Sequence, residues 1–169
     1  IDNLIIYSPL ILALVLRRQC SDTMYLSASG LPQKVAVGLS LGLLAVATYL
    51  GLRGDLARFG SVIAESLAAA SLVNFLPVFL EGAALAFGFV RLRWAFGTAA
   101  AVLLPGLVFA LAHVPRQIAA ERTLWEMAAF FCFNAALVPA ILYTVYRSRD
   151  VIWIGIVHYL MDVAIRAFE

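Results

Sequence analysis

The stretch VAVGLSLGLLAVATYLGL, from Val35 to Leu52, decides the class of this protein. It contains no charged side chain, and it stops where the polar run Arg53-Gly-Asp begins. A transmembrane helix needs about 20 consecutive, mostly apolar residues, because the hydrocarbon core of a bilayer is about 30 Å thick. The stretch therefore predicts a helix that crosses a membrane.

The composition extends this prediction to the rest of the chain. Hydrophobic residues make up 64% of the 169 residues and charged residues only 13%, whereas a soluble domain carries about 25% charged residues. The chain is long enough for about six membrane helices and leaves no room for an extramembrane domain. A formal net charge of +2 without a basic run argues against nucleic acid as a partner. We therefore predict an all-α, polytopic helix bundle whose surroundings are a lipid bilayer.

Six apolar stretches bounded by arginine, proline and glycine give the predicted helices. They run from Leu4 to Leu16, Val35 to Leu52, Ser61 to Val90, Trp94 to His113, Met127 to Tyr146 and Val151 to Phe168. The third is longer than one span requires, so it predicts either a tilted helix that kinks at Pro77 or a shallow helix ahead of the true span. We expect residues 1–60 to form N-terminal helices and loops, and residues 61–169 to form a core of four helices around a polar cavity.

Among the ionisable side chains within these apolar stretches are Glu81, His113, His158 and Asp162. A charged group at the centre of a membrane costs about 2.5 to 3.5 kcal/mol on insertion scales, so such residues usually face a cavity and mark function. His158 and Asp162 are four residues apart and therefore share one face of a helix. A carboxylate and two imidazoles supplied from three helices are the parts of a water-activating hydrolytic site.

Each of these residues also has a structural interpretation. A lone histidine in a membrane helix is often a hydrogen bond to a neighbouring helix, and such bonds average only about 0.6 kcal/mol. The ordered combination of four ionisable groups on three predicted spans favours a site over helix packing.

The order Glu, then Phe-x-x-x-His, then His-x-x-x-Asp resembles the intramembrane glutamate proteases of the CPBP family, which includes the type II CAAX prenyl proteases and bacterial relatives. The pieces that carry the resemblance are Leu80-Glu81-Gly82, Phe109-Ala-Leu-Ala-His113-Val, Trp153-Ile-Gly-Ile-Val-His158-Tyr-Leu-Met-Asp162 and the expected arginine-bearing turn Val90-Arg-Leu-Arg93. Together they extend from about Val73 to Ile165. The resemblance implies that Glu81 and His113 activate a water molecule, while His158 and Asp162 shape the site and stabilise the oxyanion. It also implies the membrane of a prokaryotic cell as the location.

The chain departs from the family in its first motif, which reads Glu-Glu-x-x-x-Arg. Here Gly82 stands in place of the second glutamate, and no arginine follows at Leu85 or Ala86. We expect an intramembrane endopeptidase that cleaves a membrane-anchored or lipidated polypeptide. The alternative is a catalytically inactive relative that acts as a binding or scaffolding subunit.

Two further functions are open to the same residues. Glutamate, histidine and aspartate are all plausible zinc ligands, but no His-Glu-x-x-His motif is present. We expect no metal and no other cofactor, with Asp162 orienting the His158 ring as a hydrogen-bond acceptor. Proton-coupled transport needs carboxylates along a path, and six helices without paired broken segments fit it poorly.

Overall fold

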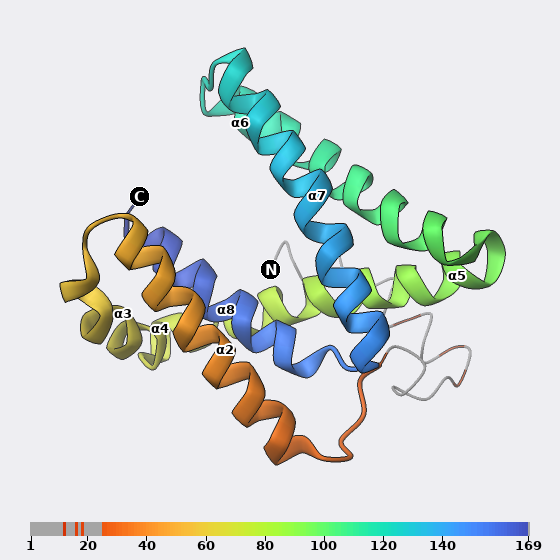
Figure 1. Cartoon of the computed structure of the whole chain (residues 1–169), viewed down its shortest axis with the longest axis horizontal. Coiled ribbons are helices and arrows are strands. Elements are labelled where there is room, and N and C mark those ends of the chain that lie inside the picture. The colour runs from red at the N-terminus through yellow and green to blue at the C-terminus, as the bar shows by residue number, and fades with distance from the viewer. Residues whose placement is uncertain (1–11, 13–15, 17, 19–24, 169) are drawn as a thin grey trace. The chain divides into compact units, whose positions relative to one another are not determined.

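The computed structural model describes Leu12, Leu16, Arg18 and residues 25–168. Every regular element in this part of the chain is helical (Figure 1). The elements from residue 31 onward are α2 (Leu31–Leu52), η2 (Leu56–Arg58), α3 (Phe59–Ser66), α4 (Ala69–Leu72), α5 (Phe75–Ala112), α6 (Val114–Ala119), α7 (Leu124–Ser148) and α8 (Ile152–Arg166). The all-α prediction is confirmed for these residues. Most of the predicted first helix, from Leu4 to Leu16, lies outside the described residues.

Three helical stretches of the described chain are long and apolar enough to cross a membrane. They are Leu31–Leu52, Ala69–Ala119 and Leu124–Ser148. Their length and composition agree with a membrane protein. The finer prediction of six spans stays a prediction.

Glycine divides α5 into two arms. Gly97 has φ +82° and ψ 174°, a conformation that is essentially restricted to glycine, so the helix runs over residues 75–96, turns back and resumes over 98–112. The expected turn at Val90–Arg93 is therefore wrong. Both arginines lie on the helix. The guanidinium carbon of Arg91 is 3.8 Å from the ring centre of Phe87, and the guanidinium carbon of Arg93 is 4.6 Å from the ring centre of Tyr146. Cation–π contacts of this kind stabilise the charge of an arginine within a helix, so these arginines do not need to lie in a loop.

The long third stretch resolves into separate helices. The short helices α3 and α4 precede α5, and α5 begins at Phe75. Pro77 lies in the first turn of α5, where its missing N–H removes no helical hydrogen bond. Of the two expected arrangements, the structure has a separate short helix and no kink at Pro77.

The described chain forms two compact units, one from residues up to 84 together with 150–169 and one from residues 85–149. The predicted division after residue 60 stays a prediction. In the first unit α2 packs on α8 through two glycines (Figure 1). A Cβ atom added at Gly38 would lie 2.9 Å from the Trp153 carbonyl oxygen, and one at Gly42 would lie 2.5 Å from Leu160 Cδ1. Residue numbers rise together along this contact, so α2 and α8 run parallel.

The core of the first unit gathers around this helix pair. Its buried members are Val46, Leu50, Val62, Tyr159, Leu160, Val163 and Ala164. The Tyr159 hydroxyl donates a hydrogen bond to the Ser66 carbonyl at 2.6 Å, and so satisfies an otherwise unpaired carbonyl where α3 ends.

The first arm of α5 also contacts α8. The Phe75 ring lies 5.3 Å from the Tyr159 ring, edge to face, and the Phe79 ring packs against Gly155. Numbers along α8 fall as those along α5 rise, so these two helices run antiparallel. The aromatic side chains of α5 therefore fix its register against α8.

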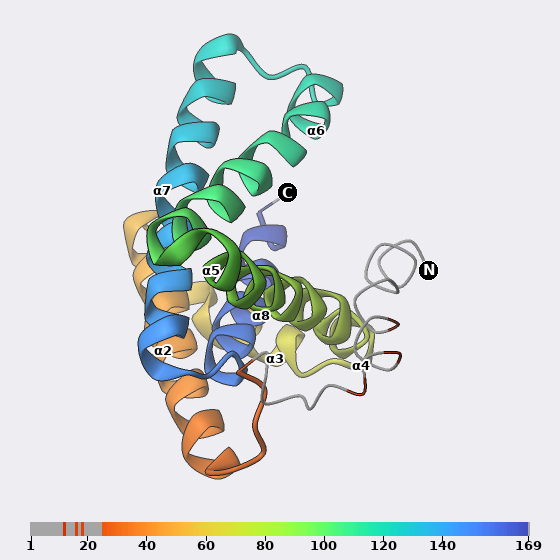
Figure 2. The ribbon, with the colours of Figure 1, turned by 90° about the vertical axis from the view of Figure 1, so that its right-hand side faces the viewer.

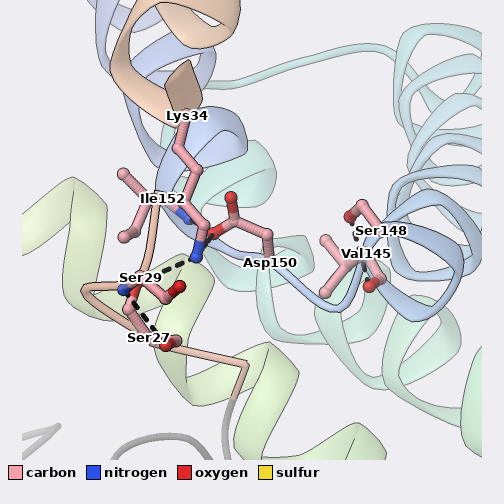
Figure 3. A network of polar contacts seen from close by, with 7 residues as sticks. All are labelled: Ser27, Ser29, Lys34, Val145, Ser148, Asp150 and Ile152. Atoms are coloured by element: carbon pink, nitrogen blue, oxygen red, sulfur yellow. Dashed lines mark hydrogen bonds and ion pairs between the residues drawn. The ribbon is translucent and has the colours of Figure 1, made fainter. Parts of the chain in front are cut away.

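A polar network joins the N-terminal ends of α2 and α8 (Figure 3). Asp150 is 5% exposed, and its Oδ1 accepts a hydrogen bond from the Ile152 N–H at 2.8 Å. The Lys34 ammonium lies 3.7 Å from the same oxygen and donates to the Ser27 carbonyl at 2.8 Å. A carboxylate is favourable at the positive end of a helix, and the lysine balances its charge.

The second unit holds the second arm of α5 against α7, and Figure 2 shows α6 joining them. A Cβ atom added at Gly106 would lie 2.5 Å from Pro139 Cδ, so this glycine admits the proline ring of α7. Helix α7 begins with a capping box, in which Thr123 N–H donates to Glu126 at 2.8 Å and Glu126 N–H donates to the Thr123 hydroxyl at 3.3 Å.

The glycine contact between α2 and α8 gives a prediction on stability. Gly38→Ala forces a methyl group against the Trp153 backbone and is expected to destabilise the protein by about 1 to 3 kcal/mol. Gly51→Ala, in the same helix, meets nothing within 4 Å and is the matched control. Thermal unfolding of both variants in detergent measures the difference. Equal melting temperatures for the two variants would contradict the packing described.

Candidate functional site

Glu81 lies on the first arm of α5 in the first unit. Its side chain is partly buried. Among the described residues, none forms a hydrogen bond or an ion pair with this carboxylate. A carboxylate that is partly removed from water needs a compensating partner, and a water molecule or a ligand can supply one.

His158 and Asp162 lie on α8, which is helical from Ile152 to Arg166. They follow Gly155 by three and seven residues, so all three share one face of the helix. Gly155 is the residue against which Phe79 of α5 packs. The predicted common face of His158 and Asp162 is thus the face that α8 turns toward the first arm of α5.

The antiparallel register brings Glu81 and His158 to neighbouring levels. With Phe79 level with Gly155, the two residues are offset by about five positions, or about 7 Å at 1.5 Å per residue. Glu81, however, follows Phe79 by two residues, about 200° around the helix at 3.6 residues per turn, so it does not lie on the face of α5 that packs against α8.

Asp162 has a partner that the sequence reasoning missed. Its Oδ2 lies 2.6 Å from an Arg166 guanidinium nitrogen, and both side chains are partly exposed. The i, i+4 spacing of the two residues is a sequence signal that could have found this pair. One carboxylate oxygen is engaged by Arg166, and the expected bond from His158 to Asp162 stays a prediction.

His113 belongs to the second unit, directly after α5 and at the start of α6. Its Nδ1 lies 2.9 Å from the Phe109 carbonyl oxygen. A carbonyl oxygen only accepts hydrogen bonds, so Nδ1 carries the proton of the neutral ring and Nε2 keeps its lone pair. The ring centres of Phe109 and Phe130 lie 4.4 and 5.9 Å from that of the imidazole. These contacts orient the ring and leave Nε2 as the basic nitrogen.

Three of the four predicted residues, Glu81, His158 and Asp162, therefore lie in one unit, and His113 lies in the other. Their convergence on a single cavity stays a prediction. Within residues 25–168, no three His, Cys, Asp or Glu side chains gather closely enough to hold a metal ion. The expectation that the protein works without a metal is left untested by this.

No family model matches the chain, and no curated protein or solved structure matches it either. The resemblance to the CPBP family therefore rests on the ordered motifs alone.

The hydrogen bond of His113 gives a prediction on its tautomer. The chain has two histidines, so the His158→Gln variant leaves His113 as the sole imidazole. In ¹⁵N-labelled protein at a pH where the ring is neutral, Nδ1 should carry the proton and Nε2 should give the shift of an unprotonated nitrogen. A proton on Nε2 would show that the Phe109 contact does not hold the ring.

Proposed function

We propose that the stretch Ala69–Ala119 crosses the membrane twice, as the six-span topology requires. Its 51 residues would extend about 75 Å as one straight helix, against about 30 Å of hydrocarbon. Gly97 supplies a point at which the chain turns back.

The direction of α8 supports two crossings. Two helices that both span and run parallel must have an odd number of crossings between them. α2 and α8 are parallel, and two crossings by Ala69–Ala119 plus one by α7 make three. A single crossing by Ala69–Ala119 would leave α8 antiparallel to α2.

Cysteine labelling tests this topology. In a Cys20→Ser/Cys132→Ser background, cysteines placed at Ala57 and Ala119 should react with a membrane-impermeant maleimide from the same side. A cysteine at Ser29, ahead of α2, should react from the opposite side. Reaction at Ala119 from the side of Ser29 would establish a single crossing instead.

We propose that the protein hydrolyses a peptide bond of a membrane-anchored or lipidated polypeptide, with Glu81 as general base. The observation that carries this proposal is a partly buried carboxylate without a partner among the described residues, on the arm of α5 that packs against the helix of His158. A carboxylate within reach of one water molecule is what base catalysis needs.

The proposed mechanism assigns one role to each residue. His113 Nε2 accepts a hydrogen bond from the water and aims its oxygen at the scissile carbonyl. Glu81 takes the second proton of that water as the C–O bond forms, and it later gives this proton to the departing amine as the C–N bond breaks. His158 donates an N–H to the oxyanion of the tetrahedral intermediate, in the manner of an oxyanion hole, and Asp162 supports that ring.

The second candidate function is binding or scaffolding without catalysis. Gly82 favours it, because the position where the family carries a second glutamate has no side chain. A Cβ atom there would have only Val151 Cγ2, at 3.9 Å, as a neighbour, so lack of space does not explain the glycine.

Glu81→Gln keeps the shape of the side chain and removes the proton acceptor. Cleavage of a membrane-anchored peptide should fall by at least about a hundredfold, while the melting temperature stays near that of the parent. Glu65→Gln, an exposed carboxylate on α3, is the control and should keep full activity. Unchanged turnover in Glu81→Gln excludes this mechanism. A parent protein inactive on a panel of anchored peptides favours the binding function.

A further inference from the structure

The C-terminal end of α2 is held in a fixed turn. Gly54, with φ +74°, follows the last residues of the helix, and the Asp55 N–H donates to the Leu50 carbonyl at 2.9 Å. The Gly54 N–H donates to the Gly51 carbonyl at 3.0 Å, which completes a Schellman motif. This turn directs Arg53 and the following Arg58 toward the end of α8.

Two arginines and two aromatic rings meet at this end of the first unit. The Arg53 guanidinium carbon lies 4.9 Å from the Phe168 ring centre and 5.1 Å from that of Tyr49. The Arg58 guanidinium carbon lies 4.6 Å from the same Phe168 ring. Tyr49 and Phe168 contact each other edge to face at 5.9 Å. We refer to Tyr49, Arg53, Arg58 and Phe168 as the arginine–aromatic cluster.

Helix capping accounts for Arg58 but not for Arg53. Because α2 and α8 are parallel, their negative C-terminal ends lie at the same end of the unit. Arg58 donates to the Ala167 carbonyl at 2.9 Å and lies 3.8 Å from the Asp55 carboxylate. Within the described chain, the Arg53 guanidinium has neither a carbonyl nor a carboxylate as partner. Among these residues no anion balances its charge.

The surroundings of Arg53 are open and apolar. Leu52 is 85% exposed and Leu56 is 56% exposed. Side chains added at Gly51 or Gly54 would meet nothing within 4 Å. A guanidinium whose face lies on aromatic rings still presents N–H donors at its edge, in the fork that matches phosphate. An anion can therefore approach this edge beside exposed leucines.

We propose that the arginine–aromatic cluster binds the phosphate of an anionic phospholipid. Helix α2 is apolar and long enough to span, so its end lies at the level of the headgroups. Leu52 and Leu56 then lie where the acyl chains begin. Free phosphate would gain nothing from these leucines. The site is independent of the proposed protease activity.

The cluster also selects against a zwitterionic headgroup. Among the described residues, Arg53 and Arg58 outnumber the carboxylate of Asp55, which lies beside Arg58. The rings that could hold a choline group already carry guanidinium groups, so a second cation is excluded from them.

Native mass spectrometry of the full chain, released from nanodiscs of equal phosphatidylglycerol and phosphatidylcholine, tests the site. The parent should retain phosphatidylglycerol in preference. Arg53→Gln should lower that preference about fivefold, because one arginine near an anionic membrane surface contributes about that factor to the affinity. Arg122→Gln is the matched control, because it removes the same charge from an arginine that already lies 3.5 Å from Glu126.

Each outcome decides the assignment. Loss of preference in Arg53→Gln with retention in Arg122→Gln, at equal melting temperatures, supports the site. Equal retention by Arg53→Gln and the parent overturns it, and so does equal loss in Arg122→Gln, which would show an effect of net charge alone. Displacement of the lipid by millimolar inorganic phosphate would overturn the choice of a lipid as occupant.

Discussion

The close parallel packing of α2 on α8 is the contact on which the first unit depends. Lipid tails are as apolar as leucine, so helices in a membrane gain little from hydrophobicity and associate through close van der Waals contact. Gly38 and Gly42 provide that contact, since their missing side chains admit α8. The same contact fixes the rotation of α8 and therefore the face on which His158 and Asp162 lie.

Parallel packing has an electrostatic cost, because the like ends of two helix dipoles lie together. The chain offsets it at both ends of the pair. At the N-terminal end the buried Asp150 accepts the Ile152 N–H, with Lys34 close by. At the other end Arg58 donates to the Ala167 carbonyl. The antiparallel first arm of α5 provides a third dipole of opposite direction.

Much of the helical pattern could be predicted from the sequence, because uncharged stretches end at charged residues or glycine. Helices α2, α7 and α8 lie close to their expected limits. The turn in α5 was misplaced because Arg91 and Arg93 looked like loop residues, whereas their aromatic contacts keep them on the helix. In the candidate site, the shared face of His158 and Asp162 follows from helical spacing. The contact of Tyr159 with Ser66 joins residues far apart in sequence and left no local signal.

The turn at Gly97 has a consequence for biosynthesis. The two apolar arms are joined through a single residue, so there is no loop between them that could stay on one side of the membrane after the first arm has inserted. If each arm crosses the membrane, the two arms must enter the bilayer together as a helical hairpin. The polar groups of the turn, with Arg91 and Arg93 nearby, must then either cross the membrane together or stay together on one side. Any side chain at position 97 would then impair insertion before it affected the finished fold, because the left-handed conformation is needed while the hairpin forms.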